Sequence, residues 1–290
     1  MAPLAHTLAL LAMTVATAAI KEVPLDMAQD SFDDQYQGCG TEMITALPAL
    51  NRSDFQKNPL FAHVWVKAVD EWQNKGSPLS PLSSPVHAIA VMAYSMKDVY
   101  KQFNTAARTA GRSPQEYRDN FHFKTFHFLL TQALVTLRDI RNEQCHDVFR
   151  GVRDVQFEVQ RGQTIRFGQF TSTSLSKNVA QKYGTDTIFQ VHTCHGVDIQ
   201  NFSFDHSNRE VLIPPYETFE VTEVTQERNK PQIKLRSTGT FSRYNCEWLQ
   251  GDTTGDRLGG RGQPLVPSAP FHLGQFLLAT TVLAVSTGIL

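Results

Sequence analysis

The chain has 290 residues, of which 41% are hydrophobic and 19% are charged, so it can bury a sizeable core as one large domain or two joined lobes. These proportions exclude a disordered or fibrous protein. The formal net charge of -1 gives no overall attraction for polyanions, and we find no basic patch of convincing length. We therefore expect no nucleic-acid partner.

Residues 1–19 predict a cleaved signal peptide. They contain no Lys, Arg, Asp or Glu, and an apolar stretch from Leu8 leads to the small residues Ala18 and Ala19. The stretch is too short to span a bilayer, which disfavours an uncleaved anchor. The protein is therefore expected to enter the secretory pathway.

Helical periodicity dominates the N-terminal half after an irregular segment, 20–60, that we expect to wrap the surface. Apolar residues at three- and four-residue intervals predict helices over 61–72 and 85–103. Ser113 is expected to cap a further helix, with Pro114 in its first turn. This helix is expected to run past Phe126 toward Ile140.

Short alternating apolar runs replace that periodicity beyond Cys145. They predict a short helix over 176–183 and strands over 155–159, 187–192, 217–224 and 232–236. The predicted fold class is α+β, with a helical N-terminal half packed on a mainly antiparallel β core.

The C-terminal tail is uncharged from Gly262 and apolar from Phe276 to the last residue. A transmembrane anchor normally needs ~20 apolar residues followed by basic ones. A shorter apolar tail behind a polar spacer is typical of a GPI signal. We expect a folded domain over 20–260 and a spacer with a GPI-type propeptide over 261–290; the alternative is a secreted protein.

The cysteine pattern favours disulfides over a metal site, because the four cysteines are widely separated. The four are Cys39, Cys145, Cys194 and Cys246, and they allow three pairings.

Two asparagines, Asn51 and Asn201, lie in N-glycosylation tripeptides.

Three short motifs carry residues suited to a nucleotide substrate. In Phe149-Arg-Gly151, Arg150 offers a planar fork of donors for a diphosphate and Gly151 allows close approach of a ligand. Alone, Arg150 is more simply a surface residue. The hydroxyls of Ser172-Thr-Ser174 are candidates for ribose contact, although such residues are also common turn formers.

The third motif places Glu210 directly before a stiff apolar run, 211–215. A carboxylate beside a glycosidic carbon hydrogen-bonds the ribose and stabilises an oxocarbenium-like transition state. The alternative is an exposed glutamate on an edge strand.

Together these motifs resemble the signature of the vertebrate ecto-mono-ADP-ribosyltransferases, whose fold is shared with arginine-modifying bacterial toxins. The resemblance covers nearly the whole chain, including the segments 93–95, 166–170 and 210–219. It implies a catalytic domain over 20–260, with NAD as co-substrate and no permanently bound cofactor or metal. It also implies the nested disulfides Cys39–Cys246 and Cys145–Cys194.

The resemblance assigns roles to individual residues. Arg150, Ser172 and Glu210 are the catalytic set, with Arg150 on the NAD diphosphate. The implied NAD contacts also include Tyr94, Gln169, Ser203 and Tyr183, the last by stacking on the nicotinamide. The alternatives are a core aromatic for Tyr94 and packing at a helix end for Tyr183.

Asn208 departs from the family pattern, in which arginine-specific members carry Glu two residues before the catalytic Glu. Asn lacks the charge needed for a bidentate pair with a guanidinium. We therefore expect intact NAD cleavage with weakened arginine transfer. Asp205 is a candidate substitute carboxylate on the same loop.

The sequence predicts a GPI-linked, cell-surface mono-ADP-ribosyltransferase with concurrent NAD glycohydrolase activity. Its expected partners are NAD, an extracellular protein acceptor and, through the anchor, the lipid bilayer. The alternatives are an enzyme that mainly hydrolyses NAD and a catalytically inactive surface binding module.

Overall fold

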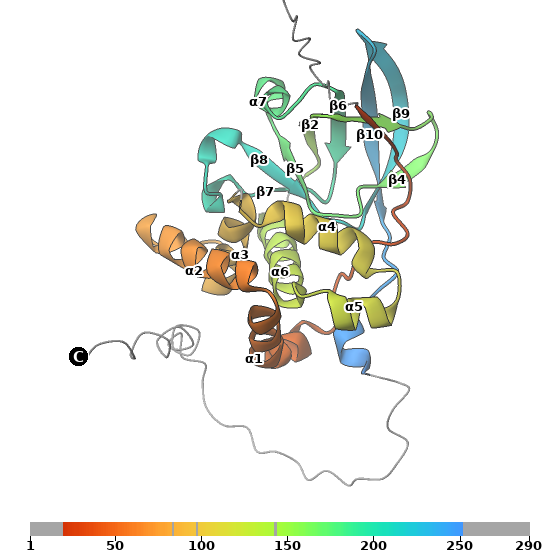
Figure 1. Cartoon of the computed structure of the whole chain (residues 1–290). Coiled ribbons are helices and arrows are strands. Elements are labelled where there is room, and N and C mark those ends of the chain that lie inside the picture. Colours follow the sequence, from red (N-terminus) through yellow and green to blue (C-terminus); the bar gives the residue numbers. More distant parts are fainter. Residues whose placement is uncertain (1–19, 83, 97, 142–143, 252–290) are drawn as a thin grey trace, which may run out of the picture. The chain divides into compact units, whose positions relative to one another are not determined.

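The computed structural model describes residues 20–251, apart from positions 83, 97, 142 and 143. The predicted signal peptide, the GPI-type tail and residues 252–260 of the predicted domain lie outside this range. Figure 1 shows α1 to α6 gathered on one side of the strands. The helices are α1 (Gly40–Lys57), α2 (Pro59–Asn74), α3 (Pro85–Ser95), α4 (Tyr100–Ala110), α5 (Pro114–Asn120), α6 (Lys124–Arg141) and α7 (Lys177–Lys182).

The predicted α+β class is confirmed by an eight-stranded sheet with the order β4-β9-β10-β6-β2-β5-β8-β7. All its pairs are antiparallel except β10 with β6. The strands are β2 (His146–Val152), β4 (Thr164–Arg166), β5 (Thr171–Ser174), β6 (Thr187–Thr193), β7 (Val197–Asp198), β8 (Glu210–Ile213), β9 (Glu217–Glu227) and β10 (Lys230–Thr240).

Two further strands form a separate parallel pair, β1 (Lys21–Pro24) with β3 (Val155–Glu158). The strand predicted over 155–159 therefore exists, but it lies beside the N-terminal segment and outside the main sheet. Leu25 continues this contact, since its N–H donates to Glu158 O at 2.9 Å. The β1–β3 pair thus fastens the start of the domain to its β half.

The prediction of an irregular segment over 20–60 was wrong for α1. Its buried positions, Met43, Leu47, Leu50 and Asp54, keep a helical spacing, but Pro48 and the acidic Asp54 obscure it. The burial of Asp54 is compensated by a hydrogen bond, in which its Oδ2 accepts the Thr125 N–H at 2.8 Å and so caps the first turn of α6. Burial raises the pKa of this carboxyl to about 6.

Two of the predicted helices are each divided in the structure. The segment 85–103 gives α3 and α4, because Met96 adopts an extended backbone. The segment beginning at Pro114 gives α5 and α6, separated by extended Phe121. Met96 and Phe121 are both buried, so the apolar spacing continues through each break. The predicted cap is confirmed, since Ser113 Oγ accepts the Glu116 N–H at 3.0 Å.

The core has two parts. One fills the space among the helices and reaches the sheet through Phe170 and Leu212. The other packs between the strands around Phe189 and Phe219. Tyr94 on α3 belongs to the first part and Val211 on β8 to the second. The first residues of β8 therefore lie where the helical half meets the sheet, which positions Glu210 at that junction.

The nested disulfide pairing is confirmed, with Cys39 bonded to Cys246 and Cys145 to Cys194. The first joins the two ends of the described domain. A second tie is the fully buried ion pair of Arg166 with Asp33. Arg166 also donates from Nη1 to Phe241 O at 2.9 Å, so this one side chain links three segments of the chain. Breaking a buried pair leaves an uncompensated charge, which stabilises these contacts against separation.

No helix of the described residues is long and apolar enough to cross a membrane.

Candidate active site

The three sequence motifs lie on neighbouring strands, because β2, β5 and β8 are adjacent in the sheet. Ser174 on β5 is paired with Phe149 on β2 and with Glu210 on β8. Strands β2 and β5 share only that one paired position, so they diverge beyond it. Arg150, Ser172 and Glu210 are thereby brought together where the strands part.

Arg150 crosses from β2 to β5, where its Nη1 donates to Ser172 O at 2.7 Å. Desolvation lowers the pKa of the guanidinium, while Tyr94, Tyr100 and Glu210 act in the opposite direction. The guanidinium is thus partly shielded from water and interacts electrostatically with the carboxyl of Glu210. Its fork of donors suits an anionic ligand such as a diphosphate.

Glu210 begins β8 and is only 8% exposed. Burial raises the pKa of this carboxyl, and hydrogen bonds from the side chains of Ser172 and Ser203 lower it. Ser203, 1% exposed, places its Oγ 3.5 Å from Glu210 Oε2. A carboxylate held by hydroxyls in a partly dry site is suited to stabilise a developing positive charge.

Tyr94 lies in the core beneath these residues, as the alternative for it anticipated. Its hydroxyl donates to Phe170 O at 2.8 Å and accepts from Asn104 Nδ2 at 3.1 Å. Ser172 also hydrogen-bonds this hydroxyl, and burial raises the pKa of the phenol. Tyr94 thus supports the segment between Phe170 and Ser172 from below.

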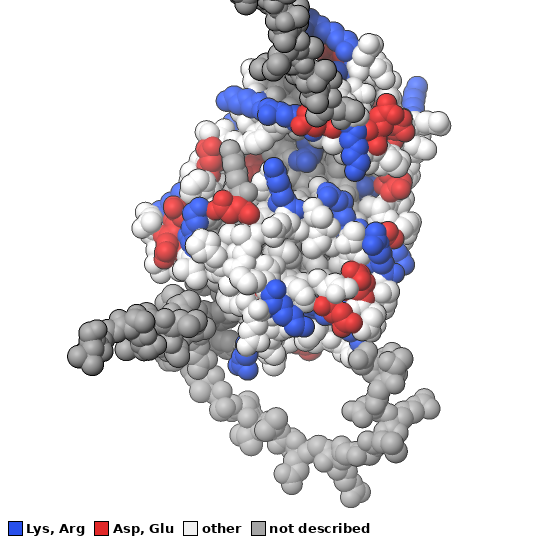
Figure 2. Space-filling view, in the orientation of Figure 1, with Lys and Arg blue, Asp and Glu red and all other residues white. Residues whose placement is uncertain are grey.

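Gln169 lies at the rim of the site, where its Oε1 accepts a short hydrogen bond from Arg108. Arg108 stands on α4 and is exposed. Burial of part of its side chain lowers the pKa of the guanidinium. Figure 2 shows Lys and Arg side chains along the middle of the face that includes α4, and acidic ones mostly nearer its margins.

Tyr183 and Asn208 form a hydrogen-bonded pair, and Tyr183 interacts electrostatically with Glu210. Tyr183, 47% exposed, donates from its hydroxyl to Asn208 Oδ1 at 2.9 Å. Asn208 ends the 3₁₀ helix η2 (His206–Asn208), and its backbone oxygen accepts from Ser174 Oγ at 2.7 Å. Arg209 then takes a left-handed turn with φ of 45°, after which the chain enters β8 at Glu210.

Lys75 is a positioning residue that the sequence did not reveal. Its ammonium donates to Ser203 O at 2.9 Å and to Phe204 O at 2.5 Å. Ser95 adds a second hold, because its Oγ accepts the Phe204 N–H at 2.7 Å. Hydrogen bonds from the ends of α2 and α3 therefore hold the loop that carries Ser203 in place. These contacts span more than a hundred residues of sequence, so no local pattern signals them.

Gly151 is needed for packing, because a Cβ there would collide with the backbone oxygens of Ala180 and Gly184. These carbonyls end α7 and the turn that follows it. A glycine at 151 therefore lets α7 pack closely on β2. This packing positions Tyr183, which directly follows α7. The close approach of a ligand at this glycine stays a prediction.

Asp205 lies on the loop beside Asn208 and is exposed. Its Oδ1 accepts from the N–H of Ser207 at 2.9 Å and from Ser207 Oγ at 2.7 Å. This carboxylate thus serves the turn of η2. Arg209, the only residue between Asn208 and Glu210, is also exposed.

The glycosylation candidates differ in their surroundings. Asn51 lies within α1, where its Oδ1 is buried and has no hydrogen-bond partner in the described chain. Asn201 is exposed in the 3₁₀ helix η1 (Gln200–Phe202). The surroundings of Asn201 suit a glycan better.

One group within the described residues has the spacing of a metal site: Cys145, Cys194 and His192, whose ligand atoms lie within 4.8 Å of one another. The two sulfurs are joined in a disulfide, so they offer no thiolate. His192 instead pairs with Asp147, at 2.9 Å. We assign no metal to this group.

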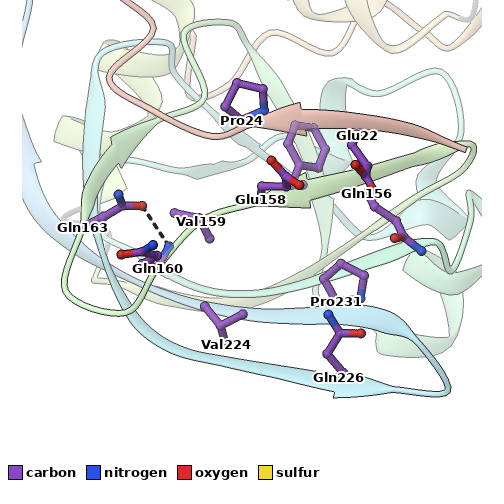
Figure 3. A pocket seen from close by; sticks show the side chains of 11 residues that line it. Glu22, Pro24, Gln156, Glu158, Val159, Gln160, Gln163, Val224, Gln226 and Pro231 are labelled. Carbon is purple, nitrogen blue, oxygen red and sulfur yellow. Dashed lines mark hydrogen bonds between the residues drawn. The ribbon is translucent and has the colours of Figure 1, made fainter.

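A cavity of about 510 Å³ lies away from these residues, between the β1–β3 pair and the β9–β10 hairpin (Figure 3). Glutamines and two glutamates, Glu22 and Glu158, dominate its lining, with Phe157 among them. None of Arg150, Ser172 and Glu210 lines it. This cavity is therefore separate from the junction of β2, β5 and β8.

Comparison with known proteins gives concordant matches. A family model described as NAD:arginine ADP-ribosyltransferase matches residues 25–243. The erythroblast NAD(P)(+)-arginine ADP-ribosyltransferase of Gallus gallus is 49% identical over 237 residues, 80% of this chain and 78% of that protein. The GPI-linked NAD(P)(+)-arginine ADP-ribosyltransferase 1 of Homo sapiens is 42% identical over 247 residues, 79% of this chain and 76% of that protein.

Among solved structures, the eucaryotic mono-ADP-ribosyltransferase ART2.2 matches with a TM-score of 0.67 and 36% identity. The match covers 77% of this chain and 98% of that chain. Variants of ART2.2 in complex with NADH and with NAD each match with a TM-score of 0.68 and 37% identity.

Proposed function

Because the chain belongs to the NAD:arginine ADP-ribosyltransferase family, we propose that it cleaves the nicotinamide–ribose bond of NAD and transfers ADP-ribose to an acceptor on an extracellular protein. The observation that carries this proposal is the meeting of Arg150, Ser172 and Glu210 on neighbouring strands. Their contacts support the roles that the sequence motifs suggested.

Arg150 holds the diphosphate of NAD. Its hydrogen bond to Ser172 O keeps the guanidinium at the point where β2 and β5 separate. Ser172 and Ser203 orient the Glu210 carboxylate. That carboxylate stabilises the positive charge that develops on the ribose as the bond lengthens. Nicotinamide leaves with the bonding electron pair, and the acceptor then attacks the ribose carbon.

Water is a competing acceptor, so we include NAD glycohydrolase activity in the proposal. The observation that favours it is the neutral Asn208, whose oxygen is engaged by Tyr183. A neutral amide cannot form the charge-assisted pair that would select a guanidinium. An inactive binding module is disfavoured, because all three catalytic candidates are present and in contact.

The protein is further proposed to be held at the cell surface by a GPI anchor. Relatives named GPI-linked support this, as does the uncharged tail of the sequence. The acceptor would then be a protein of the extracellular space or cell surface.

The test is incubation of the protein with NAD labelled in the adenosine, with and without agmatine as a guanidine acceptor. We expect nicotinamide release with little agmatine adduct. Asn208→Glu should raise the adduct at least about tenfold, because a charged pair replaces a neutral contact, without changing NAD affinity. Efficient agmatine modification by the unaltered protein would contradict the role given to Asn208, and absence of nicotinamide release would contradict the enzymatic proposal.

A further inference from the structure

The loop between β7 and β8 is attached to the end of α2 by one ammonium group. Lys75 Nζ donates to Ser203 O at 2.9 Å and to Phe204 O at 2.5 Å. The same nitrogen lies 3.3 Å from Nε2 of His206. An ammonium has three N–H donors, so Ser203 O, Phe204 O and His206 Nε2 account for all three. The imidazole of His206 is thus one of three acceptors that fasten the loop to Lys75.

The contact with Lys75 determines the protonation state of His206. A lysine ammonium can only donate, so Nε2 must accept, and the ring must be neutral with its hydrogen on Nδ1. A protonated imidazole carries an N–H donor on each nitrogen and a positive charge. It would meet the ammonium donor against donor and charge against charge. His206 is exposed, so its ring can exchange protons with the solvent.

The loop that Lys75 holds also carries a hydroxyl of the candidate active site. Ser203 is 1% exposed, and its Oγ lies 3.5 Å from Glu210 Oε2. That hydroxyl lowers the pKa of the Glu210 carboxyl, against the larger effect of burial, which raises it. The backbone oxygen of the same serine accepts from Lys75. A change in the hold of Lys75 is therefore transmitted to Glu210 through a single residue.

Other charged and titratable groups lie near His206 in the described part of the chain. Asp205 and Arg209 flank it on its own loop. Tyr183, directly after α7, interacts electrostatically with Asp205. Asp205 is opposite in charge to a protonated imidazole, whereas Arg209 and Lys75 have the same charge. The hydrogen bond from Lys75 is the contact that requires an unprotonated Nε2.

We propose that neutral His206 is a positioning residue of this reaction: by accepting a hydrogen bond from Lys75 it helps to hold Ser203 at Glu210, and protonation of its ring weakens that hold. This inference rests on the proposed function, since it concerns the carboxylate that acts on NAD. Imidazole is the side chain that ordinarily changes its charge between about pH 5 and pH 8. Nicotinamide release is therefore expected to slow on acidification through two groups, Glu210 and His206.

The test compares His206→Gln with His206→Phe, because glutamine offers an uncharged acceptor and phenylalanine offers none. At about pH 7.5, His206→Phe should lower kcat for nicotinamide release about threefold, through the loss of one exposed hydrogen bond, with little change in the KM for NAD. His206→Gln should restore most of that kcat. Between about pH 7.5 and pH 5.5, the unaltered protein should lose about threefold more activity than His206→Gln, which has no proton to gain at this position.

His63→Gln is the matched control, because it removes another exposed histidine, from α2 itself. His63 lies about 18 Å from Lys75 along the helix, at a rise of about 1.5 Å per residue. This variant should leave kcat and the pH profile unchanged. A second control places His206→Gln in a Lys75→Met background, where it should no longer alter the pH profile, because the contact between the two side chains is already lost.

The inference is overturned if His206→Gln has the pH profile of the unaltered protein, or if its effect on that profile persists in the Lys75→Met background. A lower melting temperature of His206→Phe with unchanged kcat would assign His206 to the stability of the fold, and would also overturn it. Absence of nicotinamide release from the unaltered protein at every pH would instead contradict the proposed function itself.

Discussion

The strands that carry Arg150 and Ser172 are held differently from the loop that carries Ser203 and Asn208. Strands β2 and β5 lie inside the sheet and rest on a core that includes Phe170. The loop lies between the short strand β7 and β8 and is held mainly by side chains, those of Lys75, Ser95 and Tyr183 among them.

This difference bears on the roles that we propose for these residues. Arg150 and Ser172, proposed to act on NAD, lie inside the sheet, where a change in one residue affects packing on both sides. Asn208, proposed to meet the acceptor, lies on a surface loop, where a single side chain is more readily exchanged without disturbing the core. We therefore expect acceptor choice to be more adaptable than the binding of NAD.

The largest expected effect comes from Glu210→Gln, which removes the carboxylate from the rigid side. Nicotinamide release should fall by about 10²–10³-fold, while NAD affinity measured by calorimetry changes little. Because burial raises the pKa of Glu210, activity of the unaltered protein should decline at a higher pH than for an ordinary carboxyl as the medium is acidified, and the variant should lack this decline.

Asp205→Asn is the matched control, since it removes an exposed carboxylate from the loop only. It should keep nicotinamide release close to that of the unaltered protein. A loss as large as that of Glu210→Gln would transfer the catalytic role to Asp205 and abolish the distinction between the two regions.

A smaller effect is expected for Arg150→Lys, which retains the charge but loses the planar fork. The KM for NAD should rise about tenfold, because bonds to the diphosphate and to Ser172 O are lost. Arg153→Lys is the control, as Arg153 is exposed and bonds Lys182 O at 3.2 Å. An unchanged KM in Arg150→Lys would show that the diphosphate binds elsewhere.

The smallest effect is expected for Lys75→Met, which loosens the loop. Nicotinamide release should fall about three- to tenfold through kcat, with little change in the KM for NAD. Because the Ser203 hydroxyl lowers the pKa of Glu210, its displacement should raise that pKa, and the acidic decline in activity should move to higher pH. Lys75→Arg should restore part of the activity.

Lys67→Met provides the control for the loop variant, because Lys67 stands on α2, which ends just before Lys75, and among the described residues it pairs with exposed Asp98, at 2.6 Å. It should leave both rate and pH profile unchanged. If Lys75→Met lowered only thermal stability, Lys75 would serve the fold and not the orientation of Ser203.

The sequence was most informative where a local motif carries its own chemistry. The family and the fold class were predicted, and the resemblance to that family implied the nested disulfides, which the cysteine positions alone left open among three pairings. The boundaries of the helices were harder to predict from the sequence. Buried Met96 and Phe121 continue the apolar spacing through breaks that depend on backbone conformation.

The sequence by itself determined the family and, through the resemblance that its motifs carry, the candidate groups for NAD: Arg150, Ser172 and Glu210. Tertiary structure decided what surrounds them. The bond from Tyr183 to Asn208, the grip of Lys75 on the loop and the packing need of Gly151 all join elements distant in the chain. A hydrogen bond depends on the direction of both partners, and that direction is set only when the strands and helices pack together.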